Sequence, residues 1–257
     1  MDILRKELNE IYREQNLELE SLDHAVVHQC GMMIRNTADT LNGCLVITDV
    51  QADKCHIAAG SLAPLMGWSD TSGLWTDLDS SDEDFIYGAL HPEDLPDKRL
   101  LEYEFLKRMS SLDGDDKLHY AASCSIRIKD RNGIYLWTDN TTRVVRLSPE
   151  GKIWLILCTY DLSKSRHDRK GIMPAITNLY TGETESLNFQ ERKAKLLTIR
   201  EKEILSMIRE GKSSKMIAGE LEISVNTVNR HRQNIIEKLD VANSYEAITA
   251  AVAMQLI

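Results

Sequence analysis

The segment 197–239 constrains the fold of this 257-residue chain more than any other, because three short amphipathic patterns follow one another there. Gly211 separates the first pattern from the second, and a tight turn at 222–224 separates the second from the third. The third pattern is apolar on one side and polar on the other. Three such patterns with short connections predict a small all-helical unit whose last helix presents a polar face.

Hydroxyl-bearing residues mark where each of these helices should begin. Thr198, with Glu201 three residues later, forms a capping-box signature. Ser213 and Ser224 precede the second and third patterns, where each can cap exposed backbone N–H groups. Gly211 supplies the left-handed residue that ends the first helix. We therefore expect three helices with defined ends.

Helical spacing divides each pattern into a buried and an exposed side. The predicted core residues are Ile204, Leu205, Ile208, Ile217, Ala218, Leu221, Val228, Ile235 and Leu239. On the third helix the opposite side carries Asn226, Asn229, Arg230, Gln233 and Glu237.

The outer side of the third helix has the chemistry of base recognition. Amides pair bidentately with adenine and guanidinium groups with guanine, and each pair discriminates by ~1–3 kcal/mol. We therefore predict that Asn229, Arg230 and Gln233 contact bases. Phosphate contacts are expected from Lys212, Ser213, Lys215, Thr227, His231 and Arg232. The alternative is an ordinary helical bundle with a solvated polar face, because helix–turn–helix shapes recur without DNA.

The segment resembles the LuxR/GerE-type helix–turn–helix family. The family pattern is L-T-x-R-E-x-E-[IV]-L followed by G-x-S-x-K-x-I-A-x-x-L-x-I-S-x-x-T-V-x-x-H-x-x-N-I-x-x-K-L. The matching residues are Leu197, Thr198, Arg200, Glu201, Glu203, Ile204, Leu205, Gly211, Lys212, Ser213, Lys215, Ile217, Ala218, Leu221, Ile223, Ser224, Thr227, Val228, His231, Asn234, Ile235, Lys238 and Leu239.

The resemblance implies that residues 213–232 form a DNA-binding motif with Asn229, Arg230 and Gln233 toward the bases. This chain departs from the family at Asn229, where lysine is common, at Met216, where an acidic residue is frequent, and at Asp240, where glycine is frequent. The lack of a lysine at position 229 weakens the generic attraction to phosphate. The family's target sequences and affinities therefore do not carry over to this chain.

A further helix should follow, capped by Asn243 with Glu246. Its apolar side is predicted to comprise Tyr245, Ile248, Ala251, Val252 and Leu256. The small residues Ala250 and Ala253 are candidates for self-association, and in the resembling family this helix often pairs two DNA-binding units. The alternative is a helix that only completes the core.

Charge separates the chain into two parts. From Arg192 to the end there are 11 Lys and Arg against 8 Asp and Glu, and the preceding 191 residues carry 20 against 32. Only the basic part suits a polyanion, so the acidic part should be a separate domain with another role.

Several classes of protein are disfavoured. Apolar runs are too short for a transmembrane helix and the charged start MDILRKELNEIYREQ does not suit a signal peptide, so a cytoplasmic protein with no membrane partner is expected. The five cysteines are scattered without a C-x-x-C pair, which indicates reduced, buried thiols. Nucleotide-binding, hydrolase and zinc-protease motifs are absent, and Asp49 is the one obvious strand-end acid for a phosphoacceptor, so no enzyme is predicted.

Residues 39–165 combine strands with a helical middle. Strands are expected at LNGCLVITDV, KCHIAAGS, 119–129, Ile134–Leu147 and Lys152–Tyr160, and helices at Leu62–Trp68 and Leu95–Met109. Turns at Asn132-Gly133 and Pro149-Glu150-Gly151 should join the last three strands into a meander. The stretches SLAPLMGWS, HPEDL and SIRIKDRNGIYLWTDNTTRVVRLSPEGKIWLILCTYDLS resemble the PAS family. That resemblance implies a sensory or dimerising module that holds a small molecule, haem, flavin or nothing between sheet and helices.

The sequence selects no ligand for this module. His56 and His91 are conceivable haem ligands, but a lone histidine is more often a surface or hydrogen-bonded residue. The flavin-adduct context N-C-R-F is missing. No cofactor is therefore required, and a small ligand in the cleft stays an open alternative.

Residues 1–38 are helical and charged, with Leu4, Leu8 and Ile11 at heptad spacing. They predict either a coiled-coil dimerisation arm or a helix that lies across the open face of its own domain. Residues 166–194 are expected to link the domains and to include a small hairpin that turns at Thr181-Gly182.

Together these features predict an α+β chain. An N-terminal helix and a PAS-like antiparallel sheet domain precede an all-α four-helix LuxR-type helix–turn–helix domain at 195–257. The predicted function is a bacterial, homodimeric, DNA-binding transcription regulator whose front domain senses a signal or mediates dimerisation. The alternative is a protein-interaction module that contacts RNA polymerase, as sigma-factor region four does.

Overall fold

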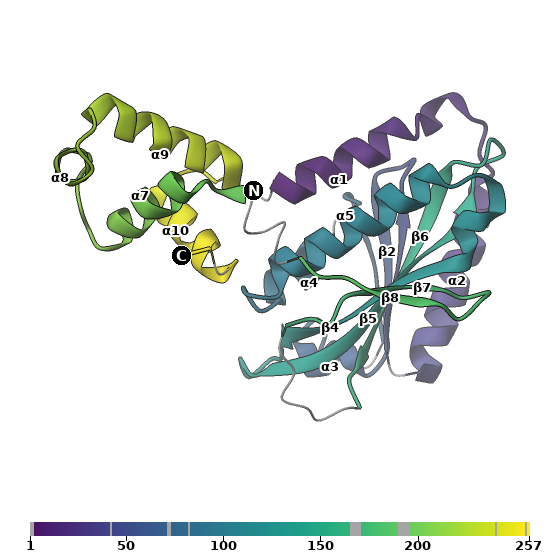
Figure 1. The fold of residues 1–257 in the computed structure, drawn as a ribbon. Helices are drawn as coiled ribbons and strands as arrows, with labels where there is room; N and C mark the ends of the chain where they lie inside the picture. Colours follow the sequence, from purple (N-terminus) through teal and green to yellow (C-terminus); the bar gives the residue numbers. More distant parts are fainter. Residues whose placement is uncertain are drawn as a thin grey trace. The chain divides into compact units, whose positions relative to one another are not determined.

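The computed structural model describes residues 3–41, 43–70, 73–81, 83–164, 171–189, 196–239, 241–254 and 256–257, without the side chains of residues 3–6 and 253. The chain divides into two compact units, of which the larger spans Leu8–Leu187 and the smaller comprises Met1–Glu7 and Asn188–Ile257. The larger unit contains an antiparallel sheet and the smaller is helical, which confirms the predicted α+β class (Figure 1).

The sheet of the larger unit has the predicted layout of two strands, a helical middle and a three-stranded meander. Its strands are β1 Cys44–Asp49, β2 Lys54–Ala59, β3 Leu74–Leu78, β4 Tyr120–Lys129, β5 Tyr135–Leu147, β6 Ile153–Leu162, β7 Ala175–Asn178 and β8 Thr184–Ser186. They are ordered β3-β2-β1-β6-β5-β4-β7-β8, and every pairing is antiparallel. Because β1 pairs with β6, the meander closes onto the first hairpin. The sequence did not predict β3.

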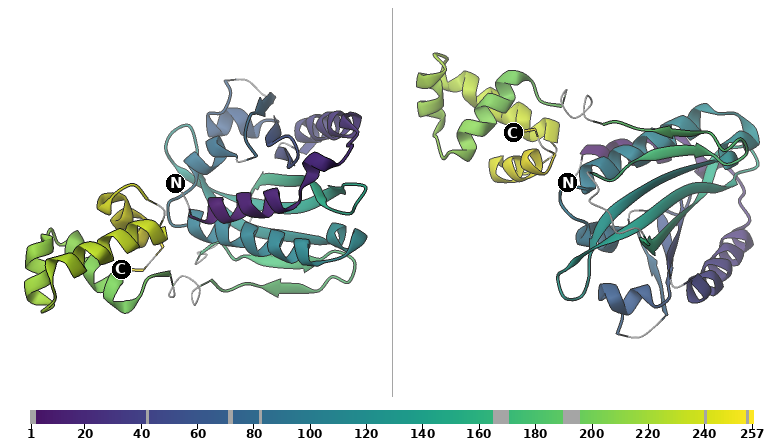
Figure 2. Two further views of the ribbon diagram at one scale, coloured as in Figure 1. Left: turned by 90° about the horizontal axis from the view of Figure 1, so that it is seen from above. Right: turned by 60° about the horizontal axis from the view of Figure 1, so that its bottom comes forward.

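Helices cover both faces of this sheet. The helical elements are α1 Ile3–Glu14, η1 Leu17–Leu19, α2 His24–Leu41, α3 Leu62–Met66, α4 Asp84–Ala89, α5 Leu95–Ser111 and η2 Gly114–His119. Figure 2 shows α2 on one face and α5 on the other. The α2 side forms an apolar core in which Val27 and Ile34 pack with Leu45, Ile47 and the neighbouring β6 residues.

The α5 side has a core that contains paired polar groups. Lys98 is fully buried and its Nζ lies 2.9 Å from Glu102 Oε1, which also accepts a hydrogen bond from the Tyr87 hydroxyl. The Tyr160 hydroxyl donates to Glu83, which is also buried. Burial raises the pKa of Glu83 to about 7, against the opposing effects of the Tyr160 hydrogen bond and Lys98. These pairings offset the cost of placing charges in an apolar interior.

The N-terminal segment differs from a continuous coiled-coil arm. It forms two helices, and Asn16, with φ at 50°, adopts the left-handed conformation just after the first ends. Leu8 and Ile11 are only 4 % and 8 % exposed, so their side chains are already buried within the chain. The side chain of Leu4 lies outside the described residues. Leu8 and Ile11 are therefore already packed within the chain, and a dimerisation role for residues 1–38 stays a prediction.

A hydrogen-bonded glutamine fixes the end of α1 to the body of the larger unit. The side chain of Gln15 donates to Ser110 Oγ at the end of α5 and accepts from the backbone N of Ile153 at 3.0 Å. In Figures 1 and 2, α1 lies beside α5. The first helix is therefore an integral part of the domain in this region.

The predicted hairpin after the meander is present, and it extends the sheet. Gly182, with φ at 78°, turns β7 into β8, and β7 pairs with β4. The segment expected to link the two domains therefore contributes two strands to the larger unit.

Three expectations about the chain's chemistry can be compared with the described residues. All five cysteines are free and buried, as predicted. In the described parts of the chain, no helix combines the length and apolar character needed to cross a bilayer. Within those same parts, no group of three or more His, Cys, Asp or Glu is arranged to hold a metal ion.

Candidate nucleic-acid interface

The smaller unit contains the four helices that the sequence predicted. These are α7 Ile199–Arg209, α8 Ser214–Glu220, α9 Val225–Leu239 and α10 Ser244–Ala253. Their shared core includes Ile204, Leu205, Ile217, Val228, Ile235, Leu239, Ala247 and Ala251. All nine residues predicted for the core of the first three helices belong to this cluster or pack against it.

A capping box fixes the start of α7 and also holds α9. The backbone N of Glu201 donates to Thr198 Oγ1 at 3.2 Å, and the backbone N of Thr198 donates to Glu201 Oε2 at 2.8 Å. Lys238, near the end of α9, also reaches Glu201 Oε2 at 2.7 Å. Burial alone would raise the pKa of Glu201. The hydrogen bonds from Lys238 and Thr198 outweigh this effect and lower that pKa. One carboxylate therefore joins two helices.

The turns that set α8 against α9 follow from local sequence. Gly211 has φ at 84°, and Ser213 Oγ accepts from the backbone N of Met216. Glu222 adopts φ at 53° in the turn before α9, where Ser224 Oγ accepts from the backbone N of Thr227. The caps predicted at Ser213 and Ser224 are confirmed.

The polar side of α9 faces solvent. Val228, Ile235 and Leu239 are buried, which fixes the rotation of the helix about its axis. The residues on its exposed side are Asn226, Asn229, Arg230, Gln233 and Glu237. Gln233 Nε2 donates to Glu237 Oε1 at 3.1 Å along this surface. The three residues predicted to contact bases therefore lie together, with Asn229 and Arg230 one turn before Gln233.

Sequence reasoning missed Val225, the first residue of α9, which is 41 % exposed. It stands one turn before Asn229 and three residues before the buried Val228, so it lies at the edge of the apolar face beside the proposed base contacts. An apolar residue in the first turn of the third predicted helix was the signal available in the sequence. Such a group can contact the methyl of thymine.

The residues predicted to contact phosphate occupy different environments. Lys215 is exposed at the start of α8, and Ser213 and Thr227 lie at the two helix caps. Lys212 is paired with Glu220 at 2.7 Å and Glu210 at 3.2 Å, and these hydrogen bonds raise the pKa of its ammonium. A phosphate would have to compete with both carboxylates for this lysine.

Two further members of the predicted phosphate set are partly buried. The guanidinium of Arg232 donates to Ser214 Oγ at 3.2 Å and to Ser244 Oγ at 3.1 Å. Arg232 therefore connects α8 and α10 to the middle of α9. His231 Nδ1 is buried, and the described residues offer it no hydrogen-bond partner.

The predicted apolar side of α10 is confirmed at Ile248, Ala251 and Leu256 and wrong at two other positions. Asn243 caps the helix as predicted, by accepting from the backbone N of Tyr245 and Glu246. Tyr245, however, is 79 % exposed and Val252 is 45 % exposed, whereas Ala247 and Met254 are buried. Alanine fits here because α10 packs closely against both α7 and α9.

The small residues proposed for self-association can be placed only in part. Ala250 is half-buried, and the side chain of Ala253 lies outside the described residues. The exposed apolar groups on α10 are Tyr245 and Val252, with Thr249 exposed between them. Larger side chains than predicted therefore form the outer surface of this helix.

The two histidines considered as haem ligands have hydrogen-bond partners in the larger unit. His56 Nδ1 lies 2.7 Å from Asp77 Oδ1. His91 Nε2 lies 3.4 Å from Arg127 Nη1, and its ring packs edge-on to Tyr135. These contacts agree with the interpretation of both as hydrogen-bonded residues.

Known proteins are similar in sequence to the C-terminal part of this chain. A family model described as "Bacterial regulatory proteins, luxR family" matches residues 195–251. The monoamine regulon transcriptional regulator of Klebsiella aerogenes is 46% identical over 54 residues, which are 21% of this chain and 24% of that protein. The uncharacterized response regulatory protein YgeK of Escherichia coli (strain K12) is 50% identical over 58 residues, or 23% of this chain and 40% of that protein.

A third relative is the transcriptional regulatory protein DesR of Bacillus subtilis (strain 168), which is 51% identical over 53 residues, or 21% of this chain and 27% of that protein. The matches thus span between about a quarter and two fifths of these relatives. Among solved structures, a phage VqmA–DPO complex aligns over 91% of this chain and 93% of that chain, with 15% identity and a TM-score of 0.29. A TM-score of that size supports no argument about this chain.

Proposed function

We propose that this chain, whose residues 195–251 match the LuxR-family model, is a sequence-specific transcription regulator that binds double-stranded DNA in the bacterial cytoplasm. In this proposal α9 enters the major groove, and the sheet domain receives a signal or mediates dimerisation.

The observation that supports base contact most directly is the rotation of α9. Three buried residues, Val228, Ile235 and Leu239, place the amide and guanidinium groups of Asn229 and Arg230 on the exposed side. In helix–turn–helix proteins the N-terminal part of the second helix of the motif contacts base edges. Asn229 and Arg230 lie in the first half of α9 and Gln233 one turn later, so all three are candidate base contacts.

Backbone contacts are proposed for the residues around this helix. Lys215, Ser213 and Thr227 surround the turn between α8 and α9 and are suited to phosphate oxygens. Lys212 and Arg232 can contact phosphate only if the phosphate displaces their partners within the protein. These partners are carboxylates for Lys212 and serine hydroxyls for Arg232. Arg232 is better explained as a residue that positions α9, because both of its hydrogen bonds are to neighbouring helices.

A homodimer would bring two such domains to one operator. The exposed Tyr245 and Val252 give α10 an apolar surface that a second copy can cover. Two domains whose α9 helices are one DNA turn apart, about 34–36 Å, would bind inverted half-sites. We therefore propose a two-fold symmetric operator.

In vitro selection from random duplex DNA with the full-length chain tests this function. The expected result is enrichment of an inverted repeat whose half-sites are centred one helical turn apart. Retention of random sequences with equal efficiency would reduce the protein to a non-specific binder, and failure to retain any duplex would remove the proposed function altogether.

A further inference from the structure

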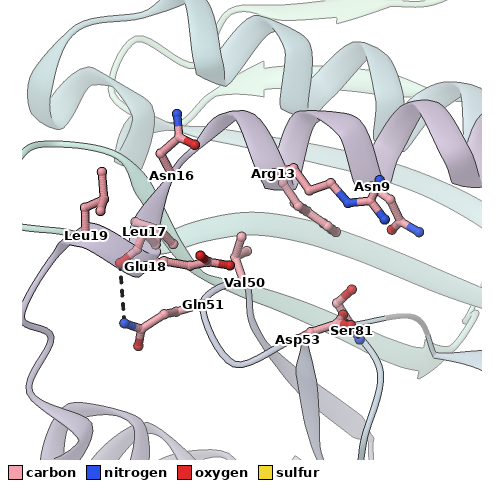
Figure 3. A pocket seen from close by; sticks show the side chains of 11 residues that line it. Asn9, Arg13, Asn16, Leu17, Glu18, Leu19, Val50, Gln51, Asp53 and Ser81 are labelled. Atoms are coloured by element: carbon pink, nitrogen blue, oxygen red, sulfur yellow. Dashed lines mark hydrogen bonds between the residues drawn. The ribbon is translucent and has the colours of Figure 1, made fainter.

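A pocket of about 540 Å³ lies in the larger unit between α1 and the turn that joins β1 to β2. Figure 3 shows Asn9 and Arg13 of α1 along one wall, Asp53 and Ser81 along the opposite wall, and Glu18 between them. The volume falls within the range of small-molecule sites. Because α1 precedes the PAS-like segment, the family resemblance does not imply this pocket.

The lining carries charges of both signs on different elements. Arg13, on α1, supplies a guanidinium group, while Glu18, in η1, and Asp53, beside β2, supply carboxylates. A guanidinium group binds a carboxylate with two parallel hydrogen bonds, and an ammonium group offers three donors to carboxylate oxygens. A ligand that carries both groups would satisfy both walls.

One side chain of the lining has an unused acceptor. Gln51 Nε2 donates to the backbone O of Leu17 at 3.5 Å. Its Oε1 is buried, and no donor among the described residues contacts it. This oxygen is enclosed by the protein itself and points away from Arg13 in Figure 3, so the charged groups of the two walls remain the candidate ligand contacts.

The pocket is formed by elements that are already fixed. Asp53 Oδ1 accepts from the backbone N of Ser81 at 2.9 Å, which joins the two ends of one wall. Gln15 holds the end of α1 through the backbone N of Ile153. Asn16 and Asp53 both adopt the left-handed conformation, with φ at 50° and 52°, which asparagine and aspartate tolerate better than other non-glycine residues. A preformed pocket loses little entropy when it binds a ligand.

We propose that this pocket binds a free amino acid, whose carboxylate pairs with Arg13 and whose ammonium group pairs with Glu18 and Asp53. The neutral amide of Asn9 offers the ligand a further donor and acceptor. Binding takes place within the larger unit and requires no DNA, so its failure would leave the proposed transcriptional function untouched.

Saturation-transfer NMR on the full-length chain without DNA tests the proposal, with each proteinogenic amino acid as a separate probe. At least one probe is expected to show saturation transfer, and calorimetry then gives its affinity. Arg13→Gln removes the cation and is expected to weaken that affinity about tenfold or more. Asp53→Asn removes a carboxylate yet keeps the acceptor for Ser81 N, and the same loss is expected.

The matched control is Arg131→Gln, which removes an equal charge from the exposed turn between β4 and β5. It is expected to bind the probe with unchanged affinity. Circular dichroism verifies that each variant is folded. If Arg13→Gln does not fold, the affinity of Asp53→Asn for the probe tests the proposal. Absence of saturation transfer from every amino acid would overturn the proposal, as would equal affinity of the wild type and the folded pocket variants.

Discussion

At the scale of single residues, most of the proposed base contacts lie in the first half of α9. Val225, Asn229 and Arg230 are exposed on the same helix, whose apolar face is fully used by the core. The proposed contacts differ in chemistry: a methyl contact for Val225, an amide pair for Asn229 and a guanidinium pair for Arg230. Each contact therefore predicts a different response to changes in DNA.

Arg230→Ala is expected to weaken binding to the selected operator by about 1–3 kcal/mol and to relax the preference at one base pair, because it removes one bidentate contact. Fluorescence anisotropy on the operator and on its single-base variants measures both effects. Arg209→Ala, an exposed arginine in the last turn of α7, is the control and should retain the preference. An equal loss on every DNA sequence would identify Arg230 as a phosphate contact.

Val225→Ser is expected to abolish discrimination between thymine and uracil at one operator position, since these bases differ only in the methyl group that Val225 would contact and serine presents no methyl. The measurement compares operator duplexes with and without that substitution, for wild type and variant. Wild-type binding should weaken on the deoxyuridine duplex, and the variant should bind both duplexes alike. Equal wild-type affinity for the two duplexes at every thymine would exclude the methyl contact.

At the scale of helices and strands, sequence predicted what local rules determine. The caps at Thr198, Ser213 and Asn243 depend on residues within one turn, and the buried faces of α7 to α9 follow from helical spacing. The strands of the meander and the hairpin at 175–186 were also predicted, since alternation and turn residues mark them.

Contacts between elements were not predictable in the same way. Lys212 meets Glu220 across α8, and Arg232 reaches the start of α8 and of α10, so both depend on how the helices pack. The apolar side of α10 was predicted correctly at Ile248, Ala251 and Leu256. It was wrong at Tyr245 and Val252, because close helix packing selects alanine over these larger side chains. The strand β3 is short and its central Thr76-Asp77 gives no apolar alternation.

The two lysines at the start of α8 make a sharp comparison at this scale. Lys215→Ala is expected to reduce the slope of log K against log salt by about 0.9, since one phosphate contact releases one counterion. Lys212→Ala is expected to change the slope less, because Glu210 and Glu220 already neutralise its ammonium group. Affinity titrations at several salt concentrations measure both slopes. A larger change for Lys212→Ala than for Lys215→Ala would show that DNA displaces the carboxylates.

At the scale of the whole molecule, the sheet domain carries a titratable group in its interior. Glu83 faces Tyr160 and Cys158 of β6 and Lys98 and Glu102 of α5, and burial raises its pKa from 4.5 to about 7. A carboxyl whose pKa is raised by folding stabilises the folded state below its unfolded pKa, and that contribution is lost as the pH rises through about 7.

The melting temperature of the wild type is therefore expected to fall, relative to that of Glu83→Gln, as the pH rises from about 4.5 to about 7. Differential scanning calorimetry of both proteins across this range measures the difference. Glu14→Gln, an exposed carboxylate on α1, is the control and should follow the wild type. Parallel curves for the wild type and Glu83→Gln would show that Glu83 does not titrate in this range.

The central claim is that the exposed side of α9 contacts base edges in the major groove, and dimethyl sulfate footprinting tests it most directly because the reagent methylates guanine N7 in that groove. The full-length chain is predicted to protect at least one guanine in each half-site of its selected operator, and Arg230→Ala should lose the same protection in both half-sites. Binding that leaves every guanine N7 of the operator as reactive as in free DNA would contradict the account.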